Sequence, residues 1–459
     1  MLSFGQAYPV ESREQVGGKT FVMRPKIRYT STLMVVMPKA LIQNLRSFAA
    51  DVTRKRVRGH AILLGLVVWG AYAFNIATPG IKDREGQLKG ADFLHFYVLG
   101  NIARLHDASI LYDAPRQAAL GADLIHQDPG ETYLPVYGPQ YSLLFRPLAN
   151  LPYGWAAAAW MLTSALVYFL CCGLLLKACP RLREDRTTIL ILAAAFPGFF
   201  YLIASGQNSI LALIAFTSAF FFFRARLPFA AGLALGLLMY KPQFGVVAAV
   251  VFVATLEWRV ILGALITGVG QLLAGAAYYG RPALDAYFAQ LVHINRNASA
   301  LEPHLERMHS LRAFWDLLLP WHGIASLLYA LTALGVIVIT VWCWRSKTPI
   351  ELRFAVFLLG TALVDPHLTD YDLVTLMPAF LVIGDRILLA AESIQRDAAR
   401  VLTYAAFCLP LFGPMLRFVH VQLSVPAYVA LFLVVASVVR NGLQMSATRE
   451  TAAVASLEA

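Results

Sequence analysis

The stretch Gly90-Ala91-Asp92-Phe93-Leu94-His95-Phe96-Tyr97 lies in a long loop, a few residues after the first strongly apolar segment. A carboxylate followed by aromatic residues suits the boundary between lipid and water, because aromatic rings tolerate an apolar and a polar neighbour there. An ionised aspartate can accept a proton from a hydroxyl group. Asp92 is therefore a candidate general base, and the alternative is a helix N-cap, since an apolar helical stretch follows it.

The composition of the chain indicates an integral membrane protein. Of its 459 residues, 58% are hydrophobic and 14% are charged, and the mean hydropathy is +0.61. Soluble domains carry about 25% charged residues. The net charge is +11, but the basic residues gather beside apolar segments, as expected for cytoplasmic loops near anionic lipid. With no zinc spacing or RNA-binding signature, this placement argues for membrane lipid and against nucleic acid as a partner.

The apolar runs predict an all-α, polytopic protein with about twelve transmembrane helices and both ends inside the cell. Arg54-Lys55-Arg56, just before the first run, holds that end in the cytoplasm. Amphipathic helices are expected at Ala91–Leu105 and Gln140–Leu151, lying on or dipping into the outer surface of the membrane. The predicted division is a basic cytoplasmic extension (residues 1–59), a transmembrane domain (60–440) with outer loops at 79–152 and 280–321, and a cytoplasmic tail (441–459).

Lys241-Pro242-Gln243 interrupts two short apolar segments, and these resemble a broken helix pair. Irregular backbone survives at membrane depth only where it lines protein or a watery cavity. A lysine at mid-membrane costs about 2.5–3.5 kcal/mol, so Lys241 should have an anionic partner. That partner is either a bound phosphate, for which an ammonium is a good point charge, or an acidic neighbour. The alternative is a lysine that snorkels to the membrane surface.

Further candidates lie at turns on the predicted outer side. Gln207 and Asn208 can hydrogen-bond a sugar or simply form the turn. His309 can bind a phosphate oxygen or pass on a proton, and Arg312 follows on nearly the same helical face; a loop histidine can also be merely structural. An acidic cluster, Asp365–Asp372, has ligand types that suit a divalent metal, but its spacing matches no strong metal motif and caps or turns are the favoured explanation. The five cysteines form no C-x-x-C pair, which argues against a metal site there.

Eight short motifs of this chain occur together and in order. They are Ala91-Asp92-Phe93-Leu94-His95-Phe96-Tyr97, Leu111-Tyr112-Asp113, Tyr137-Gly138-Pro139, Pro147-Leu148-Ala149-Asn150-Leu151-Pro152, Ser205-Gly206-Gln207-Asn208-Ser209, Ala231-Gly232-Leu233, Lys241-Pro242-Gln243 and His309-Ser310-Leu311. Together, from the first apolar segment to about residue 380, the chain resembles the polyprenol-phosphate-sugar-dependent glycosyltransferases of family 87. This family, once called a domain of unknown function, has the GT-C membrane fold and includes mycobacterial mannosyltransferases that build phosphatidylinositol mannosides.

The resemblance implies a role for several of these residues. Asp92 would be the catalytic base, and Lys241 and His309 would face the lipid-linked phosphate, with Arg312 adding positive charge. The expected contacts to the sugar or the acceptor come from four further residues, Tyr97, Gln207, Asn208 and Asp370.

These observations predict an inverting hexosyltransferase at the outer face of the cytoplasmic membrane. The donor would be a polyprenyl-phosphate sugar, with mannose as the leading candidate, and the acceptor would be a hydroxyl group of a lipid or glycan. No cofactor is required, although a divalent metal is not excluded. The alternatives are a lipid or sugar transporter (flippase), because broken helices also suit transport, and a surface-polysaccharide polymerase or ligase.

Overall fold

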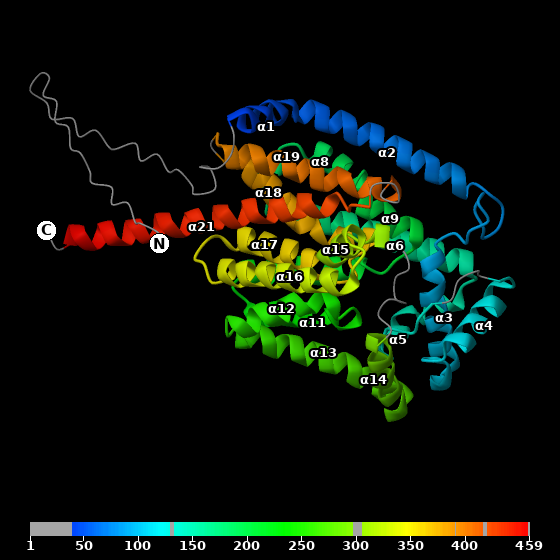
Figure 1. Cartoon of the computed structure of the whole chain (residues 1–459). Helices are drawn as coiled ribbons and strands as arrows, with labels where there is room; N and C mark the ends of the chain where they lie inside the picture. Colours follow the sequence, from blue (N-terminus) through cyan, green and yellow to red (C-terminus); the bar gives the residue numbers. More distant parts are fainter. Residues whose placement is uncertain (1–38, 129–132, 297–304, 391, 416–419, 458–459) are drawn as a thin grey trace, which may run out of the picture. The chain divides into compact units, whose positions relative to one another are not determined.

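The computed structural model describes residues 39–128, 133–296, 305–390, 392–415 and 420–457. These residues form helices and turns, without a β-strand (Figure 1). The predicted all-α class is therefore confirmed. The chain divides into two units, residues 1–44 and 45–459, and apart from α1, which crosses this boundary, the helices given below belong to the second.

The helices of the described residues have the following bounds. They are α1 (Lys39–Asp51), α2 (Arg54–Ile76), α3 (Ala91–Leu105), η2 (Ala108–Ile110), α4 (Ala114–Ile125), α5 (Tyr141–Phe145), η3 (Leu148–Asn150), α6 (Tyr153–Lys177), α7 (Pro180–Arg183), α8 (Arg186–Ala194), α9 (Pro197–Ser205), α10 (Ile210–Arg224), α11 (Pro228–Gly236), η4 (Leu237–Tyr240), α12 (Gln243–Ala254), α13 (Trp258–Tyr279), α14 (Arg281–Arg296), η6 (Leu305–Arg307), α15 (Leu311–Leu318), α16 (His322–Trp344), α17 (Ile350–Val364), η7 (Asp370–Leu376), α18 (Met377–Leu389), α19 (Ile394–Cys408), η8 (Leu409–Met415) and α21 (Ser424–Leu457).

Among the described residues, four helices are long and apolar enough to cross a membrane: α2, α6, α13 and α16. The pair α8 and α9 counts as a fifth if it is one span, bent by 48° where the two helices meet. Shorter apolar helices, such as α10, α12 and the first part of α21, pack beside them. The predicted total of about twelve spans therefore stays a prediction.

Helix α3 has the predicted bounds but not the predicted surroundings. Its residues from Phe93 to Ala103 are all buried, so the expectation of a helix lying on the membrane surface is wrong. The reason is that α3 is apolar on nearly every face, and such a helix belongs inside a protein. The second expected surface helix, Gln140–Leu151, is instead two short turns, α5 and η3, that pack against α3. The amphipathic helix of this loop is α4.

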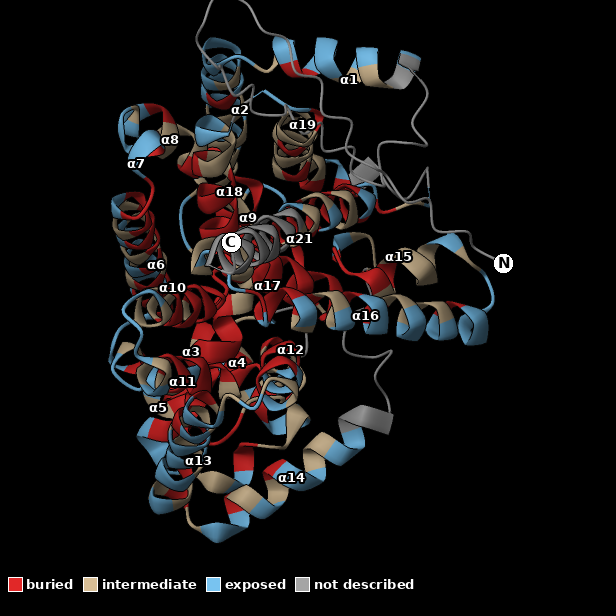
Figure 2. Ribbon diagram, turned by 90° about the vertical axis from the view of Figure 1, so that its left-hand side faces the viewer, coloured by how far each residue is buried: buried red, intermediate tan, exposed pale blue. Residues whose placement is uncertain are grey.

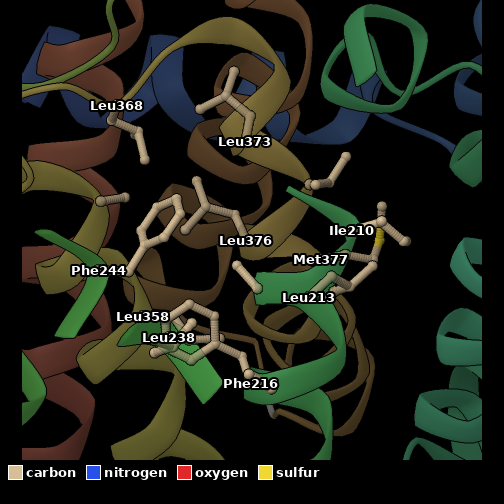
Figure 3. Close-up of a cluster of buried hydrophobic side chains, with 14 of the residues drawn as sticks. Ile210, Leu213, Phe216, Leu238, Phe244, Leu358, Leu368, Leu373, Leu376 and Met377 are labelled. Atoms are coloured by element: carbon tan, nitrogen blue, oxygen red, sulfur yellow. The ribbon is translucent and has the colours of Figure 1, made fainter. Parts of the chain in front are cut away.

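The buried core lies where broken and short helices meet. Figure 3 shows side chains from α10, η4, α12, α17, η7 and α18 converging in one cluster that includes Phe216, Phe244 and Leu376. In Figure 2 the buried colouring is concentrated in the same central helices, whereas α13, α14 and α16 carry much exposed surface. A second, aromatic part of the core joins α3 to α5, with Phe96 and Phe145 stacked at a centroid distance of 5.1 Å.

Glycine permits the close contact between α11 and α13. A Cβ atom added at Gly232 would lie 2.1 Å from the carbonyl oxygen of Val260, and one at Gly263 would lie 2.3 Å from that of Phe229. These neighbours are backbone atoms, so only separation of the two helices would relieve the overlap. The small residues therefore set the distance between the helices.

We expect Gly232→Ala to lower the stability of the protein by roughly 1–3 kcal/mol, as overpacking does in well-packed cores. The matched control is Gly270→Ala on α13, where an added Cβ meets nothing within 4 Å. That change should be neutral or slightly stabilising, because alanine favours the helix. Thermal unfolding in detergent measures both variants, and equal unfolding temperatures would contradict the packing argument.

Candidate active site

Asp92 lies in the first turn of α3, where a negative charge interacts favourably with the helix dipole. The N-cap position is occupied by Gly90, which has a left-handed backbone conformation (φ 66°). The alternative interpretation of Asp92 as the N-cap is therefore wrong. The side-chain amide of Gln207 donates a hydrogen bond to Asp92 Oδ2 over 2.9 Å. The structure thus brings together two of the predicted site residues, which are 115 positions apart in the sequence.

The turn after α9 presents Gln207 to Asp92. Gly206 ends the helix with φ 73°, and a Cβ atom there would lie 2.8 Å from the Cβ atom of Phe93, so the turn is packed directly against the start of α3. The indole Nε1 of Trp160 donates to the carbonyl oxygens of Gly206 (3.0 Å) and Gln207 (3.2 Å). The side chains of Phe93 on α3 and Trp160 on α6 therefore fix the direction in which the turn points.

The next two residues of this turn extend the site. Asn208 Nδ2 donates to the hydroxyl oxygen of Tyr137 over 2.8 Å, and the Ser209 hydroxyl donates to Asp372 Oδ1. Both residues are fully buried. The consecutive residues Gln207, Asn208 and Ser209 thus join Asp92, Tyr137 and Asp372 into one polar network through the backbone of the turn.

Lys241 has the anionic partner that its position requires. Its Nζ atom lies 2.8 Å from Asp372 Oδ1, with both side chains buried, at 8% and 1% exposure. The other carboxylate oxygen, Asp372 Oδ2, accepts hydrogen bonds from the backbone and the hydroxyl group of Thr369. The ammonium group also lies 5.0 Å from the ring centroid of Tyr371, which suits a cation–π contact. The structure therefore supports pairing of Lys241 with an acidic residue, at the end of η4 where the apolar helix breaks.

Asp370 faces Arg307, a residue that the sequence analysis did not select. The Arg307 Nε atom lies 3.2 Å from Asp370 Oδ2. Burial raises the pKa of Asp370 to about 6, although Arg307 acts in the opposite direction, and the charge of Asp92 adds to the rise. Partial desolvation lowers the pKa of Arg307, but Asp370 and, more weakly, Asp92 hold it above its usual value. Asp92, Asp370 and Arg307 are therefore close enough to interact electrostatically.

Three predicted residues have other partners in this structure. His309 is buried with its Nδ1 atom 2.7 Å from the Ser424 hydroxyl, and burial lowers its pKa to about 3, so that it is neutral at pH 7. Arg312 lies 3.6 Å from Asp316 on its own helix, α15. The Tyr97 hydroxyl donates to the carbonyl oxygen of Leu151 over 2.7 Å.

Sequence reasoning missed two residues of this cluster as site residues, Arg307 and Asp372. Asp372 stands in the acidic cluster that was noticed, but nothing local linked it to Lys241, which is 131 positions away. The only signal for Arg307 was its place in the second polar loop, two residues before His309. Among the described residues, no group of three or more His, Cys, Asp and Glu side chains is arranged to hold a metal ion.

The arrangement has the parts of a group-transfer site. It places one carboxylate next to a cluster of polar side chains and two cations, Lys241 and Arg307, each paired with an acidic side chain. A carboxylate can take a proton from an incoming hydroxyl, and cations stabilise a departing anion.

Comparison with known proteins identifies the family. The model of glycosyltransferase family 87 matches residues 136–366, which include Tyr137, Gln207, Lys241 and Arg307. Asp92 precedes the matched segment and Asp372 follows it. The searches of curated proteins and of solved structures found no match, so the GT-C architecture stays a prediction. Because the family model covers 231 of the 459 residues, just over half, this chain belongs to glycosyltransferase family 87.

Proposed function

We propose that this membrane glycosyltransferase moves a hexose, with mannose as the first candidate, from a polyprenyl-phosphate donor to the hydroxyl group of a lipid or glycan. The reaction would take place at the outer face of the cytoplasmic membrane. The observation that carries the proposal is the contact of Asp92 with Gln207 in a polar network that continues to Lys241. Membership of the family favours this function over the transporter that the broken helices also suggested.

The charge pattern supports an outward-facing site. Basic residues stand at one end of successive apolar helices: before α2, after α6, after α10 and after α16. The polar network instead lies in the segments that join the opposite ends, namely the loop after α2, the turn after α9, the break after η4 and the segment after α17. In Figure 1, α3 and α5 lie on the side of the picture where α2 ends. Because positive residues mark the cytoplasmic side, this network would face outward.

In the proposed reaction, Asp92 removes the proton of the acceptor hydroxyl as its oxygen attacks the anomeric carbon in line, with inversion. The bond from that carbon to the phosphate oxygen breaks, and the lipid phosphate leaves with its full charge. Lys241 and Arg307 stabilise this charge in a largely buried setting, where electrostatic effects are strong. Arg307 is the better placed to touch the donor, because 44% of its side chain is exposed against 8% for Lys241.

The other predicted residues take supporting roles in this proposal. Gln207 orients the carboxylate of Asp92. Asn208 and Asp370 would contact the sugar or the acceptor by exchanging their present partners, Tyr137 and Arg307. His309 is neutral, so it would act as a hydrogen-bond donor to the phosphate and not as a cation. Arg312 and Tyr97 would meet substrate only by exchanging their present partners, Asp316 and the carbonyl group of Leu151.

Purified protein in liposomes tests the donor class. We expect transfer of radioactive mannose from polyprenyl-phosphate mannose to an alkyl glycoside, and none from a nucleotide-linked mannose supplied alone. Transfer from the nucleotide-linked sugar without a lipid carrier would contradict the donor assignment, and mass spectrometry of the product would separate the addition of one sugar from block transfer. Screening other sugars on the same carrier then establishes which hexose is preferred.

Cysteine labelling tests the sidedness separately. Glu85 in the loop after α2 and Arg183 at the end of α7 are both exposed. On intact cells a membrane-impermeant maleimide should label Glu85→Cys but not Arg183→Cys, and permeabilised cells should label both. The reverse pattern would place the site at the cytoplasmic face and refute the proposed orientation.

The pH dependence of stability tests the buried state of Asp370. Its pKa is about 6 in the folded protein, against an ordinary value of 3.8. The folded state therefore holds this proton more tightly than the unfolded state, and the free energy of unfolding falls as the pH rises from about 4 to about 6. Asp370→Asn should remove this fall, which is measured as the unfolding temperature against pH.

Asp365 provides the matched comparison. Burial raises its pKa to about 7 with a further contribution from Asp372. In the wild type, Asp365 should make the free energy of unfolding fall as the pH rises from about 4 to about 7. Asp365→Asn should remove this contribution and leave the fall that is due to Asp370. If the unfolding temperature depended on pH in the same way for the wild type and both variants, neither carboxyl group would have a raised pKa in the folded protein.

A further inference from the structure

A cavity of about 210 Å³ lies between the first part of α2, helices α7 and α8, and helices α18 and α19. Its lining is largely apolar and includes Leu192, Phe380, Leu388 and Phe407. For comparison, an engineered apolar cavity of about 150 Å³ takes up benzene. This cavity therefore has room for part of an acyl chain.

Positive charge borders this apolar space. Three arginines from separate elements line it: Arg54 at the start of α2, Arg181 in α7 and Arg400 in α19. The lining also contains one acidic residue, Asp185, whose carboxylate accepts the backbone N–H of Thr188. Arg181 in addition pairs with Glu184 over 3.0 Å, with both side chains about half exposed. The cationic side chains thus outnumber the acidic ones, which suits an anionic headgroup.

A residue with a buried hydroxyl group lines the same cavity. Thr188 lines it and is only 5% exposed, yet its Oγ1 atom has no hydrogen-bond partner among the described residues. A buried polar atom without a partner costs free energy, so a ligand that carries an acceptor oxygen would be stabilised there. The ester carbonyl of a glycerolipid supplies such an oxygen between its phosphate and its acyl chains.

The walls of the cavity also suit a lipid. Helix α2 is a candidate membrane span, and only 6% of its most apolar 18-residue stretch is buried inside the protein. The Nδ1 atom of His60 on α2 lies 2.5 Å from the hydroxyl oxygen of Tyr404 on α19, which ties the two walls together. The arginine end of α2 and the loop leading to Asp92 are separated by a helix of 23 residues, or about 35 Å at the usual rise. The arginine end of the cavity is therefore distant from Asp92, whereas the opposite end reaches Met377 at the start of α18.

We propose that this cavity binds one anionic phospholipid of the bilayer. One acyl chain fills the apolar lining, the phosphate lies against Arg54, Arg181 and Arg400, and an ester carbonyl accepts the hydrogen bond of Thr188. The polyprenyl phosphate carrier is not the occupant, because its phosphate must reach the polar network at the other end of α2.

Native mass spectrometry and thermal unfolding of the delipidated full chain test this site. We expect phosphatidylglycerol to bind at one molecule per chain and to raise the unfolding temperature, and phosphatidylcholine to do neither at the same concentration. Arg54→Ala combined with Arg400→Ala should weaken phosphatidylglycerol binding about tenfold or more. Arg226→Ala is the control, since it removes an exposed arginine that does not line the cavity.

A cavity-filling variant tests the apolar half. An added Cβ at Gly384 would make ordinary contacts of 3.5 Å and 3.7 Å with the Leu182 methyl groups, so Gly384→Leu should keep the fold and abolish the stabilisation by phosphatidylglycerol. Equal effects of the two phospholipids, or undiminished binding to Gly384→Leu, would overturn the proposal. Displacement of phosphatidylglycerol by polyprenyl phosphate would overturn it too, since the site would then belong to the carrier.

Discussion

Replacing Asp92 by asparagine should lower sugar transfer by about 10²–10⁴-fold, the usual contribution of a general base, and should leave donor binding within about twofold. Asparagine keeps an oxygen that can accept the hydrogen bond from Gln207, so the first turn of α3 should stay in place. It cannot take the proton of the acceptor hydroxyl. The loss should therefore appear in kcat and not in KM for the donor.

The control for this result is Asp113→Asn in the same loop. Asp113 is the N-cap of α4, where its side chain accepts the backbone N–H of Arg116. Asparagine serves about as well as aspartate at an N-cap, so this variant should retain the wild-type rate and the wild-type unfolding temperature. Transfer at the wild-type rate by the Asp92→Asn protein would show that another group is the base.

The second large effect concerns Lys241 and Asp372. Lys241→Met leaves the carboxylate of Asp372 buried without its cation, which in other proteins costs about 3–5 kcal/mol. We expect this variant to lose both stability and transfer. Removal of the exposed pair Arg281 and Asp285, whose side chains are 89% and 66% exposed, should cost less than about 1 kcal/mol.

The double variant Lys241→Met with Asp372→Asn separates a structural role from a functional one. Asparagine removes the unpaired buried charge and keeps a side-chain oxygen that can accept from Ser209 or Thr369, so the unfolding temperature should recover in large part. Transfer should not recover, because the cation is still missing from the site. If transfer returned together with stability, Lys241 would serve only to pack the break between η4 and α12.

The sequence predicted correctly those features that depend on neighbouring residues. Apolar content and periodicity indicated helices, and the bounds expected for Ala91–Leu105 are those of α3. The cost of a lysine at membrane depth required a partner for Lys241, and the order of short motifs indicated the family that the comparison confirms. Each of these follows from local geometry or from charge placed beside apolar segments.

Tertiary structure decided which side chains meet. Asp92 and Gln207 are 115 positions apart, and Lys241 and Asp372 are 131 positions apart. Helix α3 is buried instead of lying on the surface, because α5, η3 and α6 cover its apolar faces. Local preferences carry no information about such partners, since burial and ion pairing depend on which helices pack together. The sequence alone determined the helical class and the candidate residues, and the packing of distant helices determined the contacts among them.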